Sequence, residues 1–143
     1  MTVPDEVETR ILEKAEYVEE AVLVLADKQS LSETAYRTDR AQRAIVEREF
    51  QTAIEACIDI AGLVIGTADV PMPETYAGRF RALGELGVCS VETSERMRKA
   101  AGFRNVLVHQ YGDEIDDAIV FRHLQEEVEW LVQFLREIRA YLE

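Results

Sequence analysis

Apolar residues recur along this chain at steps of three and four, the spacing that gathers them on one face of an α-helix. Four long segments and one short segment show this pattern, and none alternates apolar and polar residues with the period of two that is typical of a strand. We therefore expect an all-α fold, an up-and-down bundle of four long helices plus one short helix. The expected helices cover residues 5–28, 35–68, 74–87, 91–111 and 117–142.

The ends of these helices and the chain length favour a single domain. Ser90 is a good N-cap for residues 91–111, and the heptad of apolar positions over 117–142 favours packing at a shallow angle. A chain of 143 residues suits one hydrophobic core, and it contains no internal repeat, low-complexity tract or linker. Residues 1–143 are therefore expected to form one helical domain.

Composition places the chain among globular proteins, with 48% hydrophobic and 31% charged residues. Cys57 and Cys89 are far apart and form no Cys-x-x-Cys pair, so we expect buried structural thiols in a reducing compartment. The acidic start lacks the features of a signal peptide, and no apolar run reaches the roughly 20 residues of a membrane span. The prediction is a soluble cytoplasmic protein that does not bind membranes.

The net charge of −12 is concentrated at the two ends. Residues 1–27 and 113–143 each carry −6, and residues 28–112 are neutral. The acidic ends are typical of solvated helix faces, and their field repels a polyanion. Any nucleic acid must therefore meet the neutral middle, where the candidate nucleic-acid-binding residues are Arg96, Arg98 and Lys99, close to Arg104.

The segment "GFRNVLVHQYGD", residues 102–113, combines an arginine, an asparagine, a histidine and a tyrosine within an apolar run. On a continuous helix Arg104 shares the apolar stripe of Met97 and Leu107, whereas Asn105 and His109 share a neighbouring face. A cation on an apolar face needs an anion, so Arg104 must meet a carboxylate or a phosphate.

Simpler interpretations of these residues are open as well. A lone histidine in a helix is usually structural, a tyrosine at a helix end usually packs, and the bare spacing from arginine to histidine is weak evidence. A di-metal carboxylate bundle would need Glu-x-x-His pairs, and neither His109 nor His123 follows such a glutamate. No metal site is therefore expected, and His123 is interpreted as an exposed or partly packed helix residue.

The whole string "AGFRNVLVHQYGDEID" resembles the signature of the HEPN superfamily, and specifically its HepT-like toxin branch. That signature is an arginine, four residues, a histidine, any residue and a tyrosine, which here are Arg104, His109 and Tyr111. Asn105 supplies the polar residue that is typical after the arginine. The resemblance extends to "AIVEREFQTAIEACIDIAGLVI", which is similar to the family's long second helix, and to "TYAGRFRALGELGV", which is similar to its short third helix.

The resemblance implies a metal-independent endoribonuclease toxin that uses no cofactor and acts on RNA, with no DNA expected. It implies Arg104, Asn105 and His109 as catalytic residues. It also implies a minimal nucleotidyltransferase antitoxin as partner, which transfers AMP from ATP to Tyr111. These residue types suit the chemistry, since histidine can transfer protons and arginine can hold two phosphoryl oxygens.

Helical geometry adds an expectation about assembly. Five residues place Arg104 and His109 about 140° apart around a helix, and one chain supplies one histidine at this site for two proton transfers. If two such helices meet on a twofold axis, one cleft can contain Arg104 and His109 together and can have two histidines. We therefore expect a homodimer through the helix of residues 91–111, the fourth in the chain. On the same helix Tyr111 returns to the angle of Arg104, at the rim of the phosphate site. The alternative function is a non-catalytic helical module that binds a nucleotide or a protein partner.

Overall fold

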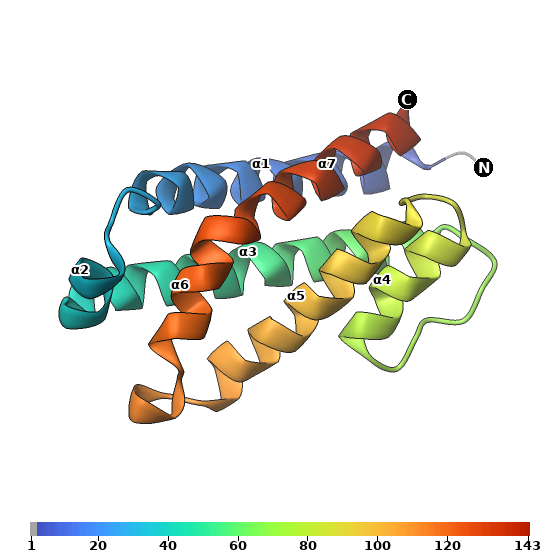
Figure 1. The fold of residues 1–143 in the computed structure, drawn as a ribbon. Coiled ribbons are helices and arrows are strands. Elements are labelled where there is room, and N and C mark those ends of the chain that lie inside the picture. Colours follow the sequence, from blue (N-terminus) through green and yellow to red (C-terminus); the bar gives the residue numbers. More distant parts are fainter. Residues whose placement is uncertain (1–2) are drawn as a thin grey trace.

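The structure, a computed structural model, describes residues 3–143 and confirms the all-α fold over them (Figure 1). No strand occurs in residues 3–143, and no helix there combines the length and the apolar character needed to cross a bilayer. The helices are α1 Asp5–Lys28, α2 Glu33–Thr38, α3 Arg40–Gly66, α4 Tyr76–Glu85, α5 Val91–His109, the short 3₁₀ turn η1 Gly112–Glu114, α6 Asp117–Glu126 and α7 Val128–Leu142.

The helix expected over residues 35–68 is in fact two helices, α2 and α3, which meet at Asp39. This residue has extended backbone angles (φ −110°, ψ 102°), and its carboxylate accepts the backbone N–H groups of Ala41 and Gln42. An aspartate in that position is an N-cap, because it satisfies amide donors that have no partner inside the helix. Asp39 therefore ends α2 and starts α3.

The helix expected over residues 117–142 also divides, at Glu127 between α6 and α7. The N–H of Glu127 still donates to the carbonyl of His123 at 2.9 Å, although its own angles (φ −108°, ψ −12°) depart from those of a regular α-helix. The break is therefore a kink and not a loop, and the expectation of one continuous helix was wrong. Figure 1 shows α6 turning away from the line of α7 towards the end of α5.

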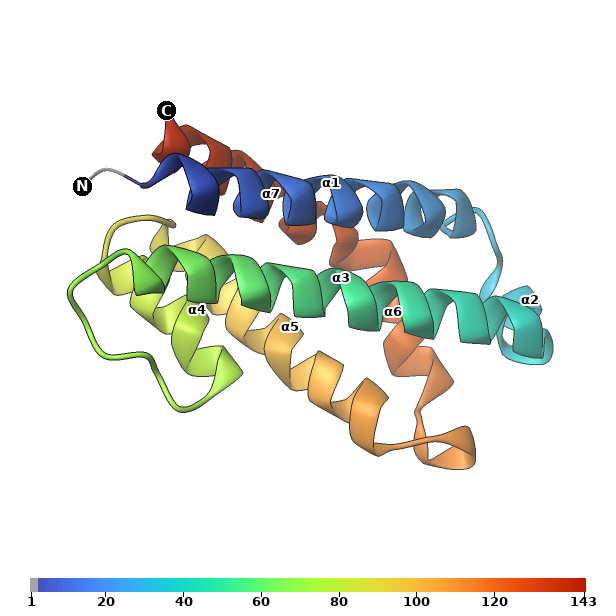
Figure 2. The same cartoon turned by 180° about the vertical axis from the view of Figure 1, so that it is seen from behind.

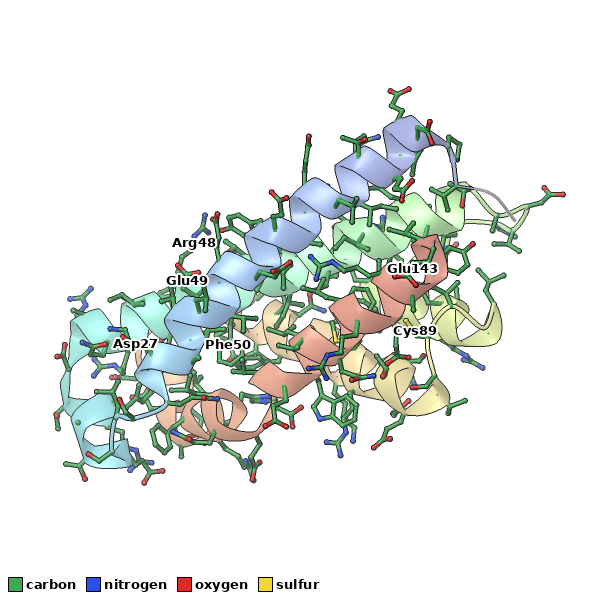
Figure 3. The ribbon with its side chains drawn as sticks, turned by 90° about the horizontal axis from the view of Figure 1, so that it is seen from above. Asp27, Arg48, Glu49, Phe50, Cys89 and Glu143 are labelled. Atoms are coloured by element: carbon green, nitrogen blue, oxygen red, sulfur yellow. The ribbon has the colours of Figure 1, made fainter. Side chains whose placement is uncertain are left out.

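Helix α3 is the centre of the bundle. α1 packs along one side of it, with α7 beside α1, and α4 and α5 pack on the other side (Figures 1 and 2). Seen from above, α1 and α7 lie side by side over the rest of the molecule (Figure 3). The last turn of α5 and the η1 turn that follows it, orange in Figures 1 and 2, lie on the side of the molecule away from α1 and α7.

Aromatic contacts fix α5 and α7 in the core. The rings of Phe50 in α3 and Phe103 in α5 meet edge to face with centroids 5.4 Å apart, and those of Phe80 in α4 and Phe134 in α7 do so at 5.5 Å. All four side chains are buried. Truncating a buried phenylalanine to alanine typically costs about 3–5 kcal/mol of folding free energy, so these contacts hold α5 firmly against α3.

The start of α5 is capped as the sequence predicts and is also tied to α7. The Ser90 hydroxyl accepts the N–H of Thr93 at 3.1 Å, and the Glu137 carboxylate accepts the backbone N–H of Ser90 at 2.6 Å. Burial raises the pKa of Glu137, but its hydrogen bonds from Ser90, Thr93 and Gln133 outweigh burial and lower the pKa overall. Glu137 is therefore held as a carboxylate that fastens α5.

Both cysteines are buried and free, as predicted for structural thiols. Burial raises the pKa of both thiols. The carboxylate of Glu137 raises the pKa of Cys89 further, to about 12. Because the thiolate is the reactive form, neither residue is poised for nucleophilic chemistry in the folded protein.

Candidate active site

The motif residues stand at the C-terminal end of α5, but the helix stops earlier than expected. Its last residue is His109, and Gln110 (ψ 156°) and Tyr111 (φ −156°, ψ 159°) are extended. Gly112 then takes a positive φ of 62°, which side-chain-bearing residues rarely adopt, and the chain reverses. The expectation that Tyr111 shares a helical stripe with Arg104 is therefore wrong. Instead, Tyr111 stands outside the helix with 76% of its surface exposed.

Arg104 is half-buried, and its guanidinium is contacted from three helices. Its Nε lies 3.6 Å from Oε1 of Glu55 in α3. Its Nη1 donates to Oδ1 of Asn105 at 3.1 Å, and its central carbon stands 5.3 Å from the centre of the Tyr76 ring in α4. The anion that the sequence requires for this cation is therefore, within the chain, the carboxylate of Glu55.

Asn105 and His109 are exposed and share one face of α5, as the helical spacing predicts. Asn105 uses its carboxamide oxygen on Arg104, which makes it a partner of the arginine in this structure. His109 ends the helix in solvent, whereas Arg104 turns inward towards α3 and α4. One chain alone thus places the two side chains on different sides of α5.

The three candidate RNA-binding residues do not form one patch. Arg96 leans on α7, with its guanidinium 5.0 Å from the centre of the Trp130 ring and 3.7 Å from the carboxylate of Glu127. Arg98 is exposed and pairs with Glu95 at 2.7 Å, and Lys99 is exposed. Of these residues, Arg98 lies on the face of α5 that carries Asn105 and His109.

His123 has a packing role, in agreement with the sequence interpretation. Its ring stacks on Phe103, with centroids 3.9 Å apart and planes 10° from parallel. Burial lowers the pKa of His123, and the neighbouring Glu127 and Glu126 counteract this in part. The imidazole, stacked on a buried ring, joins α6 to α5.

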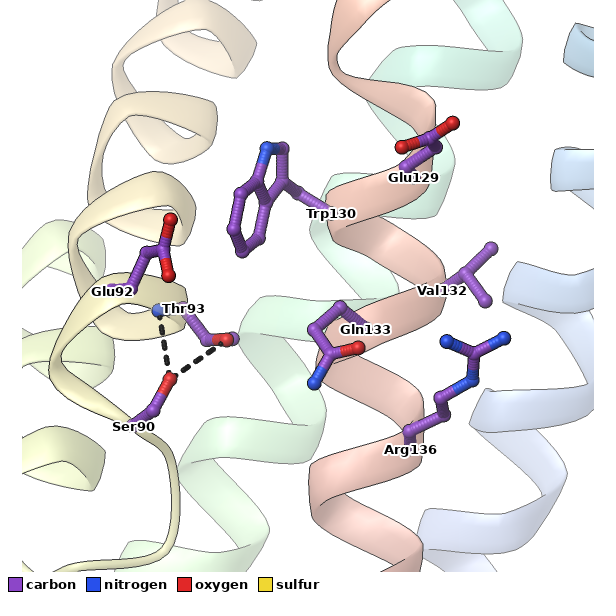
Figure 4. Close-up of a pocket in the computed structure, with 8 residues that line it drawn as sticks. All are labelled: Ser90, Glu92, Thr93, Glu129, Trp130, Val132, Gln133 and Arg136. Atoms are coloured by element: carbon purple, nitrogen blue, oxygen red, sulfur yellow. Dashed lines mark hydrogen bonds between the residues drawn. The ribbon is translucent and has the colours of Figure 1, made fainter.

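A cavity of about 430 Å³ lies between the start of α5 and α7 (Figure 4). It is at the opposite end of α5 from His109, roughly 24 Å away at a rise of 1.5 Å per residue. None of Arg104, Asn105 and His109 lines it. Over residues 3–143 no group of three or more His, Cys, Asp or Glu side chains is placed to hold a metal ion. The residues that line the cavity are Ser90, Glu92, Thr93, Glu129, Trp130, Val132, Gln133 and Arg136.

Glu55 and Tyr76 contact Arg104 but were not predicted from the sequence. Glu55 stands in "AIEACI", where all its neighbours at 53, 54, 56, 57 and 58 are buried, so it is an isolated charge in an apolar run just as Arg104 is. Two such charges of opposite sign are a signal for pairing, although the sequence does not say which two helices come together. Tyr76 offers no comparable signal, because an exposed aromatic at a helix start is common.

The chain is similar in sequence to a known family and to named nucleases. A family model described as "Ribonuclease HepT-like" matches residues 11–138. An mRNA nuclease HepT of Shewanella oneidensis is 31% identical over 63% of this chain and 67% of its own. A tRNA nuclease HepT of Aphanizomenon flos-aquae is 28% identical over 80% and 77%.

Among solved structures, the tri-AMPylated HEPN toxin of Shewanella oneidensis, in complex with an MNT antitoxin, has the same fold. It superposes with a TM-score of 0.83 at 24% identity, over 92% of this chain and 97% of that one. Because the family model covers nearly the whole chain, the chain belongs to the ribonuclease HepT-like family.

Proposed function

We propose that this protein is a metal-independent endoribonuclease toxin of a toxin-antitoxin system. The observation that carries the proposal is the end of α5, where an exposed His109 follows an arginine that is already held in place and partly removed from water. Two relatives named as nucleases of mRNA and of tRNA support an RNA substrate. The middle of the chain, which carries no net charge, is the region that RNA would meet.

The proposed reaction uses the RNA's own 2′-hydroxyl as nucleophile. A histidine takes the proton of this hydroxyl, O2′ attacks phosphorus, and the P–O5′ bond breaks as a second histidine returns a proton to O5′. Arg104 stabilises the negative charge on the phosphoryl oxygens. Asn105 holds Arg104 through its carbonyl oxygen, which leaves its amide N–H groups free to donate to the phosphate.

We further propose that the working form is a homodimer built through α5. Arg104 and His109 leave the helix on different sides, so a cleft that contains both needs the second chain. The outer surface of α5 also exposes apolar side chains, including Val106 and Val108. A twofold contact there brings two histidines to one cleft, one for each proton transfer.

The homodimer is tested by its mass in solution. Sedimentation equilibrium at micromolar concentration should give twice the 16.3 kDa of one chain. Val108→Asp places a charge on the proposed contact and should shift the protein towards monomer and reduce cleavage with it. A wild-type protein that sediments as a monomer while it cleaves RNA would contradict the composite site.

Tyr111 is the proposed site of AMP transfer by a minimal nucleotidyltransferase antitoxin. Its side chain is well exposed, just beyond His109, and therefore accessible to a second enzyme. The AMPylated toxin seen in the similar structure supports this modification. Each transferred AMP adds a negative phosphodiester and a bulky nucleoside beside the last turn of α5, so it opposes RNA by both charge and volume.

Mass spectrometry tests the modification. After incubation with an MNT-type nucleotidyltransferase and ATP, the peptide that contains Tyr111 should gain one or more AMP units. The rate of RNA cleavage should fall as the modified fraction of the protein rises. Tyr111→Phe should gain none, while Tyr17→Phe, which removes another exposed tyrosine hydroxyl, should behave as wild type. Equal inhibition of the Tyr111→Phe protein would mean that the antitoxin acts by binding alone.

A further inference from the structure

Outside the motif, the group that pairs with Arg104 is the carboxylate of Glu55. The Nε of Arg104 is shielded from water and makes no hydrogen bond, and the group that faces it is the carboxylate of Glu55 at 3.6 Å. At that distance the contact is an ion pair and not a hydrogen bond. A desolvated cationic N–H is costly unless an opposite charge lies close by, so Glu55 stabilises the arginine where it stands.

Glu55 is itself held in position within α3. Its Oε1 accepts the side-chain amide of Gln51, one turn earlier, at 2.8 Å. The same oxygen is the one nearest to Nε of Arg104. The guanidinium of Arg104 is therefore linked through Glu55 to Gln51 on the central helix α3. These contacts restrain the carboxylate of Glu55 before any substrate binds.

Tyr76 restrains the guanidinium from a second direction, and its ring is restrained in turn. Both Arg104 and Arg79 bring their guanidinium carbons close to this ring, at 5.3 Å and 5.2 Å. Arg79 lies across Gly62 of α3 and donates from Nη1 to the Ile58 carbonyl at 3.2 Å. A Cβ on residue 62 would stand only 2.6 Å from that Nη1, so the glycine makes room for Arg79.

We propose that Glu55, supported by Tyr76, is a positioning residue that sets the orientation of Arg104 for the phosphoryl group. The inference rests on the ribonuclease function proposed above. Glu55 faces Nε, and Asn105 engages Nη1, so the described contacts leave the other N–H groups of the planar fork for phosphoryl oxygens. A guanidinium held in a fixed orientation stabilises the transition state more than a mobile one, because no free energy is spent on orienting it during the reaction.

Glu55→Gln tests this role by removing the charge and keeping the shape. We expect kcat on RNA to fall by about tenfold or more, since a small displacement of a catalytic group can cost up to about a hundredfold, while KM changes little. Asp59→Asn is the matched control, because it also removes one negative charge and one ion pair, to Lys14, one turn further along α3. It should leave kcat near the wild-type value. Glu55→Asp, which restores the charge, should recover part of the loss.

A second measurement does not depend on activity. The Arg104 Nε–H signal in a ¹H–¹⁵N spectrum, assigned by its absence in Arg104→Lys, should exchange slowly with water in the wild type and clearly faster in Glu55→Gln. If wild-type protein cleaves no RNA, the proposed function fails and this signal alone decides the positioning role. Unchanged exchange, or a Glu55→Gln protein with wild-type or higher kcat, would overturn the inference. Higher activity would mean that the carboxylate competes with the phosphate.

Discussion

Replacing His109 by alanine is expected to abolish RNA cleavage and leave the fold intact. Loss of a general acid or base typically lowers kcat by about 10²–10⁴, and the proposed dimer loses the base and the acid together, so the upper end of that range applies. His109 is exposed at the last position of α5, and surface substitutions of this kind usually change stability by no more than about 0.5 kcal/mol. Initial rates on single-stranded RNA and thermal unfolding of the same samples measure both effects.

The other histidine provides the control for this experiment. His123→Gln removes the ring that stacks on Phe103 and should lower the unfolding temperature while kcat stays near wild type at temperatures where the protein is folded. The two substitutions should thus affect opposite properties. A folded His109→Ala protein with full activity would place the chemistry elsewhere.

Arg104→Lys is expected to be nearly as damaging as Arg104→Ala, with kcat lowered by about 10²–10³ in both, the range found when a preorganised charge-stabilising donor is removed. Lysine keeps the charge but lacks the planar fork that can hold two phosphoryl oxygens and rest on the Tyr76 ring. Alanine also removes the ion pair of Glu55, which should cost on the order of 1 kcal/mol of stability at this partly exposed site.

Arg98→Ala is the matched control for Arg104, because it removes an arginine from the exposed face of the same helix. Arg98 pairs with its neighbour Glu95, so its loss should raise KM slightly and leave kcat unchanged. Steady-state rates at fixed salt separate the two effects. An Arg104→Lys protein with wild-type kcat would show that charge alone suffices and that the fork has no special role.

The limits of sequence-based prediction are clearest where helices end. Periodicity continues through Asp39 and Glu127, so apolar spacing alone predicts one helix where the chain forms two. The helix predicted over residues 35–68 is interrupted because the Asp39 side chain competes for backbone N–H groups. Tyr111 was misplaced for a similar reason, since α5 ends at His109 and the Gly112 turn takes the chain away from the helical path.

The site shows the same division between local and tertiary information. The inward position of Arg104 and its need for an anion follow from one helix, and the structure confirms both, with the side chain half-buried beside Glu55. The identity of that anion depends on how α3 packs against α5, which Phe50 and Phe103 determine through contacts far apart in sequence. The catalytic roles of Arg104, Asn105 and His109, the dimer and the modification of Tyr111 stay predictions.

The chemistry of the cut ends tests the central claim most directly. A defined single-stranded RNA, incubated with the purified protein in EDTA, should yield fragments with 2′,3′-cyclic phosphate and 5′-hydroxyl ends, because attack by the 2′-hydroxyl leaves those ends and the proposed residues need no metal. The His109→Ala protein purified in parallel should yield no fragments. Cleavage that stops in EDTA, fragments with 3′-hydroxyl and 5′-phosphate ends, or equal cleavage by the His109→Ala protein would contradict the account.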